Sequence, residues 1–267
     1  MSYNTQNVSQ TDSQNDSSNL ECVSFSPTEV CGNVYTVLDH GFVSLVDSMG
    51  TFDDIANSAR ISYQKHQFMD TPIRNPNEEY KINTNHPNFR LVKRLWEDEH
   101  LSPFEMCELK FHVKAPLFVV AQWVRHRTAS INQISYRYTP ALEEYYVPRH
   151  FNMQSSINHQ SSSGTSYDPE KNVLLRDNYI SILKEATKFY RNLIDMGIAR
   201  EEARMILPQC LYTEFYWKIN LRNLLHFLKL RCDKNAQYEI REYAQTIQLI
   251  LFDLMPELKL IVNLPKW

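Results

Sequence analysis

The stretch from Leu109 to Tyr138, LKFHVKAPLFVVAQWVRHRTASINQISYRY, changes its pattern twice. Apolar and polar residues alternate from Leu109 to Val113, which predicts a half-buried strand. Pro116 then starts an apolar run that reaches Val124, and proline is well tolerated in the first turn of a helix. The sequence therefore predicts a strand followed directly by a buried helix, which is a pattern of an α+β fold.

Three basic residues, Arg125, His126 and Arg127, follow this predicted helix, and a polar loop leads from them to Ser135-Tyr136-Arg137-Tyr138. No carboxylate lies within the run, and guanidinium groups bind phosphate in bidentate geometry. The run therefore fits a phosphate-bearing ligand. The alternative is a solvated helix end, where cations complement the helix dipole.

The rest of the chain predicts a single α+β domain in which a mixed sheet packs with long helices. A strand, turn and strand are expected from Val34 to Val46, and another strand from Phe215 to Ile219. A long helix is expected from Tyr179 to Ile194, with Gly197 as its stop, and its wide apolar stripe is assigned to the core and to an interface.

The domain is expected to span residues 34–267. Residues 1–33 are predicted to be a disordered polar tail, because 14 of the 18 residues from 2 to 19 are Ser, Thr, Asn or Gln. Residues 152–172 are predicted to be a flexible polar loop.

The composition is that of a globular protein, with 43% hydrophobic and 22% charged residues. A net charge of -3 argues against a general nucleic-acid binder, so any anion site must be local. The five cysteines form no Cys-x-x-Cys pair, and no metal site is expected. We expect a cytoplasmic protein, without a membrane span or a signal peptide.

The spacing Arg-His-Arg, seven residues, Ser, one residue, Arg resembles the signature of the flavin-dependent thymidylate synthases, and the resemblance extends from about Gly41 to about Ile240. It implies reductive methylation of deoxyuridine monophosphate (dUMP) to dTMP. FAD would be the cofactor, NADPH and 5,10-methylenetetrahydrofolate the co-substrates, and the protein a homotetramer with active sites between subunits.

The resemblance also implies which side chains bind the flavin. They belong to five separate segments of the chain, and they are Ser62, His100, Ser102, Arg125, His126, Arg127, Gln133, Asn220, Arg222 and His226. There is no Gly-x-Gly-x-x-Gly, so a Rossmann-type flavin site is not expected, and side chains would bind the phosphates.

A second set of side chains is expected to bind the nucleotide: Gln122, Arg125, Gln133, Ser135, Tyr136, Arg137, Arg204 and Arg231. Arg231 is the expected catalytic residue, because a permanent cation stabilises negative charge that develops on the pyrimidine. Position 133 is a glutamate in some relatives, and the glutamine here lacks that charge. Taken alone, Arg204 would be a surface residue paired with Glu201 or a neighbour, whereas the resemblance implies that it reaches the substrate phosphate of an adjacent subunit.

Two rival functions remain from the sequence. One is a nucleotide-binding regulatory protein without turnover, against which the joint presence of Ser135, Arg137, Arg204 and Arg231 argues. The other is a flavin reductase, which would not need a uridylate pocket.

Overall fold

The computed structural model describes residues 34–62, 81–157 and 161–265, so the predicted tail of residues 1–33 lies outside the described residues. No helix in these ranges is long and apolar enough to cross a membrane. The elements in chain order are strands β1 (Val34–Val37) and β2 (Gly41–Met49), helices α1 (Phe52–Ile61) and α2 (Pro87–Glu97), the 3-10 helix η1 (Ser102–Met106), strand β3 (Glu108–Pro116), helix α3 (Leu117–Trp123), strands β4 (Ala129–Gln133), β5 (Asn152–Gln154) and β6 (Ser162–Ser166), helices α4 (Pro169–Asp195) and α5 (Arg200–Ala203), the 3-10 helix η2 (Arg204–Ile206), strand β7 (Tyr212–Asn220), and helices α6 (Leu221–Arg231), α7 (Tyr238–Leu254) and α8 (Leu258–Ile261).

Five strands form one sheet in the order β1-β2-β3-β7-β4, and every neighbouring pair is antiparallel. The α+β class is confirmed, but the prediction of a mixed sheet is wrong for the described strands. The reason is that Met49 pairs with Glu108 and Pro116 pairs with Tyr212. Each long connection therefore leaves and re-enters the sheet at the same end, which makes the joined strands antiparallel.

Strand β4 replaces the polar loop that we predicted after Arg127. It pairs with β7 from Ala129↔Ile219 to Gln133↔Phe215 and forms one edge of the sheet. Four of its five side chains are exposed, so it lacks the alternation of buried and exposed residues that identifies a strand in a sequence. The consequence is a rigid backbone beneath Gln133 rather than a loop.

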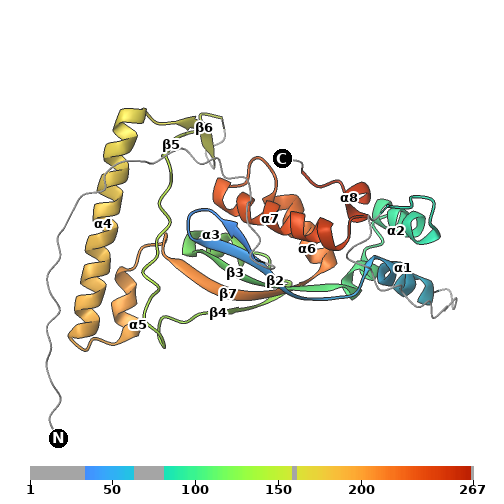
Figure 1. Ribbon diagram of the computed structural model, residues 1–267, viewed down its shortest axis with the longest axis horizontal. Coiled ribbons are helices and arrows are strands. Elements are labelled where there is room, and N and C mark those ends of the chain that lie inside the picture. Colours follow the sequence, from blue (N-terminus) through green and yellow to red (C-terminus); the bar gives the residue numbers. More distant parts are fainter. Residues whose placement is uncertain (1–33, 63–80, 158–160, 266–267) are drawn as a thin grey trace, which may run out of the picture.

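Helices α3, α6 and α7 cover one face of the sheet (Figure 1). Their contact with the sheet centres on Trp123, whose ring meets Trp217 at 5.2 Å and Phe215 at 5.3 Å in edge-to-face geometry. Phe227 of α6 lies 5.1 Å from the same ring. This aromatic packing fixes the last residue of α3, and so it fixes the point at which the basic segment begins.

Helix α4 stands at one end of the molecule, away from the helices that cover the sheet (Figure 1). It begins at Pro169, ten residues before the predicted start, because Asp168 caps it by accepting from the backbone N–H groups of Glu170 and Lys171. The predicted stop at Gly197 is confirmed by its φ of +80°. The assignment of the apolar stripe to the core is confirmed for Leu183 and Tyr190, which are buried, whereas Ile182 is 64% exposed.

The range 152–172, predicted as a loop, contains regular structure. Strands β5 and β6 form a two-stranded antiparallel sheet, and the first turn of α4 follows. Asn172 holds these parts together, because its side chain bonds the backbone of Phe151 and Tyr167. The polar composition hid the hairpin, because none of its side chains is buried.

Candidate active site

The basic segment turns sharply after α3. The N–H of His126 donates to the carbonyl of Trp123 at 3.0 Å, and β4 starts three residues later. This turn directs the His126 ring inward against Phe227, 4.9 Å away, while Arg125 and Arg127 are exposed. The three adjacent basic residues therefore have different surroundings.

Arg231, the last residue of α6, meets this turn. Its Nε–H donates to Nε2 of His126 at 3.0 Å, and its Nη2 donates to the backbone carbonyl of Gln122 at 3.2 Å. The side chain of Gln122 is engaged separately, since its amide donates to Oε1 of Gln237 at 2.6 Å. The structure thus brings together three of the predicted site residues, Gln122, His126 and Arg231.

The guanidinium of Arg231 is held along one edge. Nε–H and the neighbouring Nη2 N–H lie along that edge of the planar group, and both have acceptors in the chain. The remaining N–H groups, on Nη1 and Nη2, have no acceptor among the described residues. They form a fork that suits two neighbouring acceptor atoms of a planar ligand.

The electrostatics of this cluster favour a neutral imidazole. Burial, Arg231 and His226 together lower the pKa of His126 to about 4. Burial also lowers the pKa of Arg231, but a guanidinium stays charged in proteins. At neutral pH the cluster therefore carries one fixed cation beside a neutral histidine.

Arg125 and Arg127 flank His126 in the chain, and both are exposed, as is His226. None of them makes a hydrogen bond or ion pair with a described residue. His226 lies near His126, with 6.2 Å between the ring centroids. Two unpaired guanidinium groups and an imidazole match the phosphates and polar ring atoms of a dinucleotide, so the residues present fit FAD.

Further predicted flavin residues lie at the other end of α6. Arg222 forms an ion pair with Glu105 of η1, and exposed Ser102 begins that short helix. Asn220 accepts from the backbone N–H of Asn223 at 3.0 Å, which makes it the N-cap of α6. The side-chain oxygen of Asn220 is therefore used structurally.

His100 and Ser62 complete this side of the site. Both are exposed, and Ser62 directly follows α1. Helix α1 reaches η1 through Ser58, whose hydroxyl donates to the carbonyl of Pro103 at 3.4 Å. One continuous region thus runs from α1 over η1 to α6.

The predicted phosphate residues form a separate group beyond β4. Arg137 makes an ion pair of 2.8 Å with Glu201 of α5, one of the partners that the sequence offered for Arg204. Arg204 itself is exposed, at the start of η2. Ser135 is partly buried, and its hydroxyl accepts from the N–H of Arg137 at 3.4 Å.

Tyr136 and Gln133 are anchored to β7. The hydroxyl of Tyr136, which is only 6% exposed, donates to the carbonyl of Tyr212 at 2.6 Å. Gln133 donates its amide to the hydroxyl of Thr213 at 3.1 Å, which leaves its carbonyl oxygen for a ligand. No sequence pattern pointed to Thr213, Gln237 or the Glu201 partnership, since each lies far along the chain from the residue it holds.

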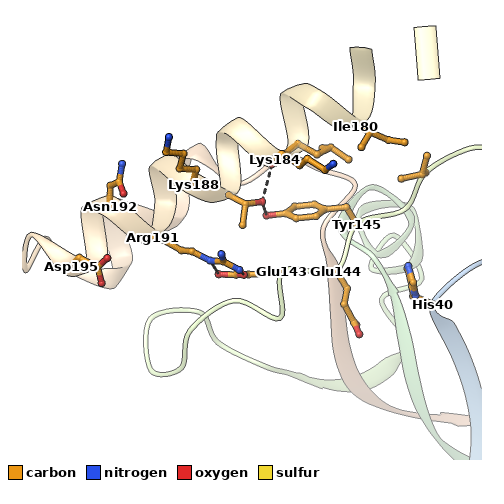
Figure 2. Close-up of a pocket in the computed structure, with 13 residues that line it drawn as sticks. His40, Glu143, Glu144, Tyr145, Ile180, Lys184, Lys188, Arg191, Asn192 and Asp195 are labelled. Carbon is orange, nitrogen blue, oxygen red and sulfur yellow. Dashed lines mark hydrogen bonds and ion pairs between the residues drawn. The ribbon is translucent and has the colours of Figure 1, made fainter. Parts of the chain in front are cut away.

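The larger of two described hollows, about 690 Å³, lies between α4 and the segment around Tyr145 (Figure 2). Thr187 of α4 donates to the hydroxyl of Tyr145 at 2.9 Å, and Arg191 pairs with Glu143. The other hollow, about 430 Å³, lies beside β5 and α4. No predicted site residue lines either of these two hollows.

Comparisons with known proteins identify relatives of this chain. A family model described as "Thymidylate synthase complementing protein" matches residues 44–257. A flavin-dependent thymidylate synthase of Thermus thermophilus is 47% identical over 220 residues, which cover 82% of this chain and 74% of that relative. The flavin-dependent thymidylate synthase of Wolbachia pipientis wMel is 43% identical over 223 residues, covering 83% and 73%.

Solved structures are also similar. The UMP/dUMP methylase PolB of Streptomyces cacaoi, bound with 5-Br UMP, matches 83% of this chain and 92% of its own, with a TM-score of 0.69 and 27% identity. The same enzyme bound with 5-Br dUMP matches with a TM-score of 0.67 and 30% identity.

Proposed function

The chain belongs to the family of flavin-dependent thymidylate synthases, and from that premise we propose how its residues divide the work of the reaction. It is an enzyme that methylates dUMP reductively to dTMP. The carbon comes from 5,10-methylenetetrahydrofolate, and FAD, when reduced by NADPH and bound, supplies the hydride.

Flavin binding falls to the donors around α6. Arg125 and Arg127 are free to bind the pyrophosphate, because no described carboxylate competes for them. His226 and the residues at η1, including His100 and Ser102, contact the remainder of the cofactor. Arg222 takes part only if it shares its guanidinium with Glu105, its present partner.

The nucleotide phosphate binds between Arg137 and Arg204, beside Ser135. Arg137 already uses one nitrogen on Glu201, and the planar guanidinium keeps other N–H groups for phosphate oxygens. Gln133 reads an amide-like edge of the ligand with its carbonyl oxygen, because Thr213 occupies its amide.

Arg231 carries the chemical step in this proposal. Methylation at C5 of the uracil requires extra electron density in the ring. This density also appears as negative charge on N3 and on the oxygens beside it. The open fork of Arg231 matches two such neighbouring atoms, and a fixed cation in a half-buried setting stabilises their charge. The half-buried guanidinium, held at one edge and open at the other, is the observation that carries the proposal.

A homotetramer with shared sites accounts for two features of the single chain. Leu175, Ile182, Phe189 and Met196 recur every seventh residue along α4 and past its end, and they are 43%, 64%, 52% and 75% exposed. A stripe of this spacing is typical of a helix that packs against a second helix. Joining of subunits would also cover site residues that are exposed in the single chain, such as Arg125, Arg127 and Arg204. We propose a cytoplasmic location, since the described cysteines are free thiols.

Release of tritium from dUMP labelled at C5 tests the function. Protein supplied with FAD, NADPH and methylenetetrahydrofolate should release tritium and form dTMP, since C5 exchanges its hydrogen for the new carbon. NADPH oxidation without tritium release would support a flavin reductase instead. Nucleotide binding without either reaction would support the regulatory protein.

A further inference from the structure

Arg231 reaches the reaction site only if its guanidinium keeps one orientation. Arginine has several rotatable bonds, and a free side chain at a helix end samples many rotamers. Here two contacts oppose that freedom, one from the imidazole of His126 and one from the carbonyl of Gln122. Only the first comes from a side chain.

The hydrogen bond fixes the proton on His126. The Nε of arginine always carries hydrogen, so Nε2 of the imidazole must offer its lone pair, and the ring proton must be on Nδ1. Burial and the neighbouring Arg231 and His226 lower the pKa of His126 to about 4, so the acceptor form persists at neutral pH.

The imidazole ring is itself held in place. Phe227 packs against it at 4.9 Å with an interplanar angle of 73°, and the backbone N–H of His126 bonds Trp123. Trp123 and Phe227 belong to the aromatic core. A rigid chain of contacts therefore leads from the core through His126 to the guanidinium.

We infer that His126 is a positioning residue, whose Nε2 holds the inner edge of Arg231 so that the outer fork faces the pyrimidine. This inference rests on the proposed role of Arg231, and it gives His126 this role in place of the flavin contact that the sequence resemblance implies. His126 itself does not exchange a proton with the substrate.

The positioning role of His126 is tested with four variants, which are His126→Phe, His126→Gln, Arg231→Ala and the double variant His126→Phe/Arg231→Ala. Phenylalanine keeps the ring and its packing but has no acceptor, whereas the carbonyl oxygen of glutamine reaches about as far as Nε2. His112→Phe is the matched control. It is another half-buried histidine with a bonded partner, Glu214, and it lies on the opposite face of the sheet.

Measurements on the FAD-loaded protein are tritium release, bound flavin, and dUMP affinity followed by the change in flavin absorbance. His126→Phe should lower kcat about 10- to 100-fold and weaken dUMP binding. This range corresponds to the free energy of a hydrogen bond to a charged group. Bound flavin should stay near the wild-type level. His126→Gln should recover most of the loss, and His112→Phe should match wild type.

The double variant gives the decisive comparison. If His126 acts through Arg231, His126→Phe should cost nothing further in the Arg231→Ala background. Three results would overturn the inference while leaving the function intact. They are a loss of kcat from His126→Phe that is as large in the Arg231→Ala background as in the wild type, a failure of His126→Gln to recover activity, and a loss of bound flavin from His126→Phe. If His126→Phe does not fold, His126→Leu replaces it. Absence of tritium release from the wild type would overturn the proposed function, and the inference with it.

Discussion

Replacement of Arg231 by alanine should separate catalysis from cofactor binding. The side chain is partly buried, and its two described bonds go to Nε2 of His126 and the carbonyl of Gln122. Loss of a donor aimed at developing negative charge costs about 2.7–4 kcal/mol, or roughly 100- to 1000-fold in kcat. Arg125 and Arg127 are unchanged, so bound flavin should remain.

Arg231→Lys refines this prediction. Lysine keeps the charge but places it on a single ammonium, which cannot hold His126 along one edge and present a fork at the other. Its turnover should therefore lie between those of the wild type and Arg231→Ala. Lys229→Ala is the control, because Lys229 is a basic, exposed residue of the same helix.

The assay combines tritium release at saturating dUMP with the absorbance of bound flavin. Turnover of Arg231→Ala within a few-fold of wild type would refute the charge-stabilising role. Loss of flavin together with turnover would mean instead that Arg231 is part of the cofactor site.

Further predictions concern assembly, pH and stability. Ile182→Glu should reduce the assembly state seen by light scattering, because it puts a charge into the apolar stripe of α4. The free energy of unfolding should fall as the pH drops from about 6.5 toward about 4, because His126 binds a proton in the unfolded state but not in the folded state over this range. Denaturant unfolding at several pH values should show a weaker dependence of this free energy on pH for His126→Gln. Tyr136→Phe should lose about 1 kcal/mol in urea unfolding, because it removes the buried bond to Tyr212. Deletion of residues 1–19 should leave assembly and turnover unchanged, because that segment offers almost no apolar surface.

Much of the fold could be predicted from local patterns of apolar and polar residues. The alternation around Phe111 and Trp217 identified β3 and β7, because each strand buries one face only. Asn220 is a residue type that favours a helix start, and in the structure its short polar side chain satisfies a backbone N–H of α6. Edge strand β4 escaped detection, since its side chains are mostly exposed and its stability comes from backbone bonds to β7.

The long helix shows a different limit. Its period and its stop at Gly197 follow from the sequence, which assigns its apolar stripe to the core and to an interface without saying which residues belong to each. A helical pattern records which face is apolar and not what covers that face. Only the tertiary structure showed that Ile182 and Phe189 remain exposed in a single chain.

The family, the α+β class and the identity of the basic residues can all be read from the amino-acid sequence, because a spaced motif and local periodicity lie within short segments. Which of these residues meet depends on the fold. Arg231 and His126 are 105 residues apart, and their bond depends on α3 and α6 packing on the same face of the sheet. Such a contact is set by the packing of the whole core, and neither residue's neighbours in the chain contain that information.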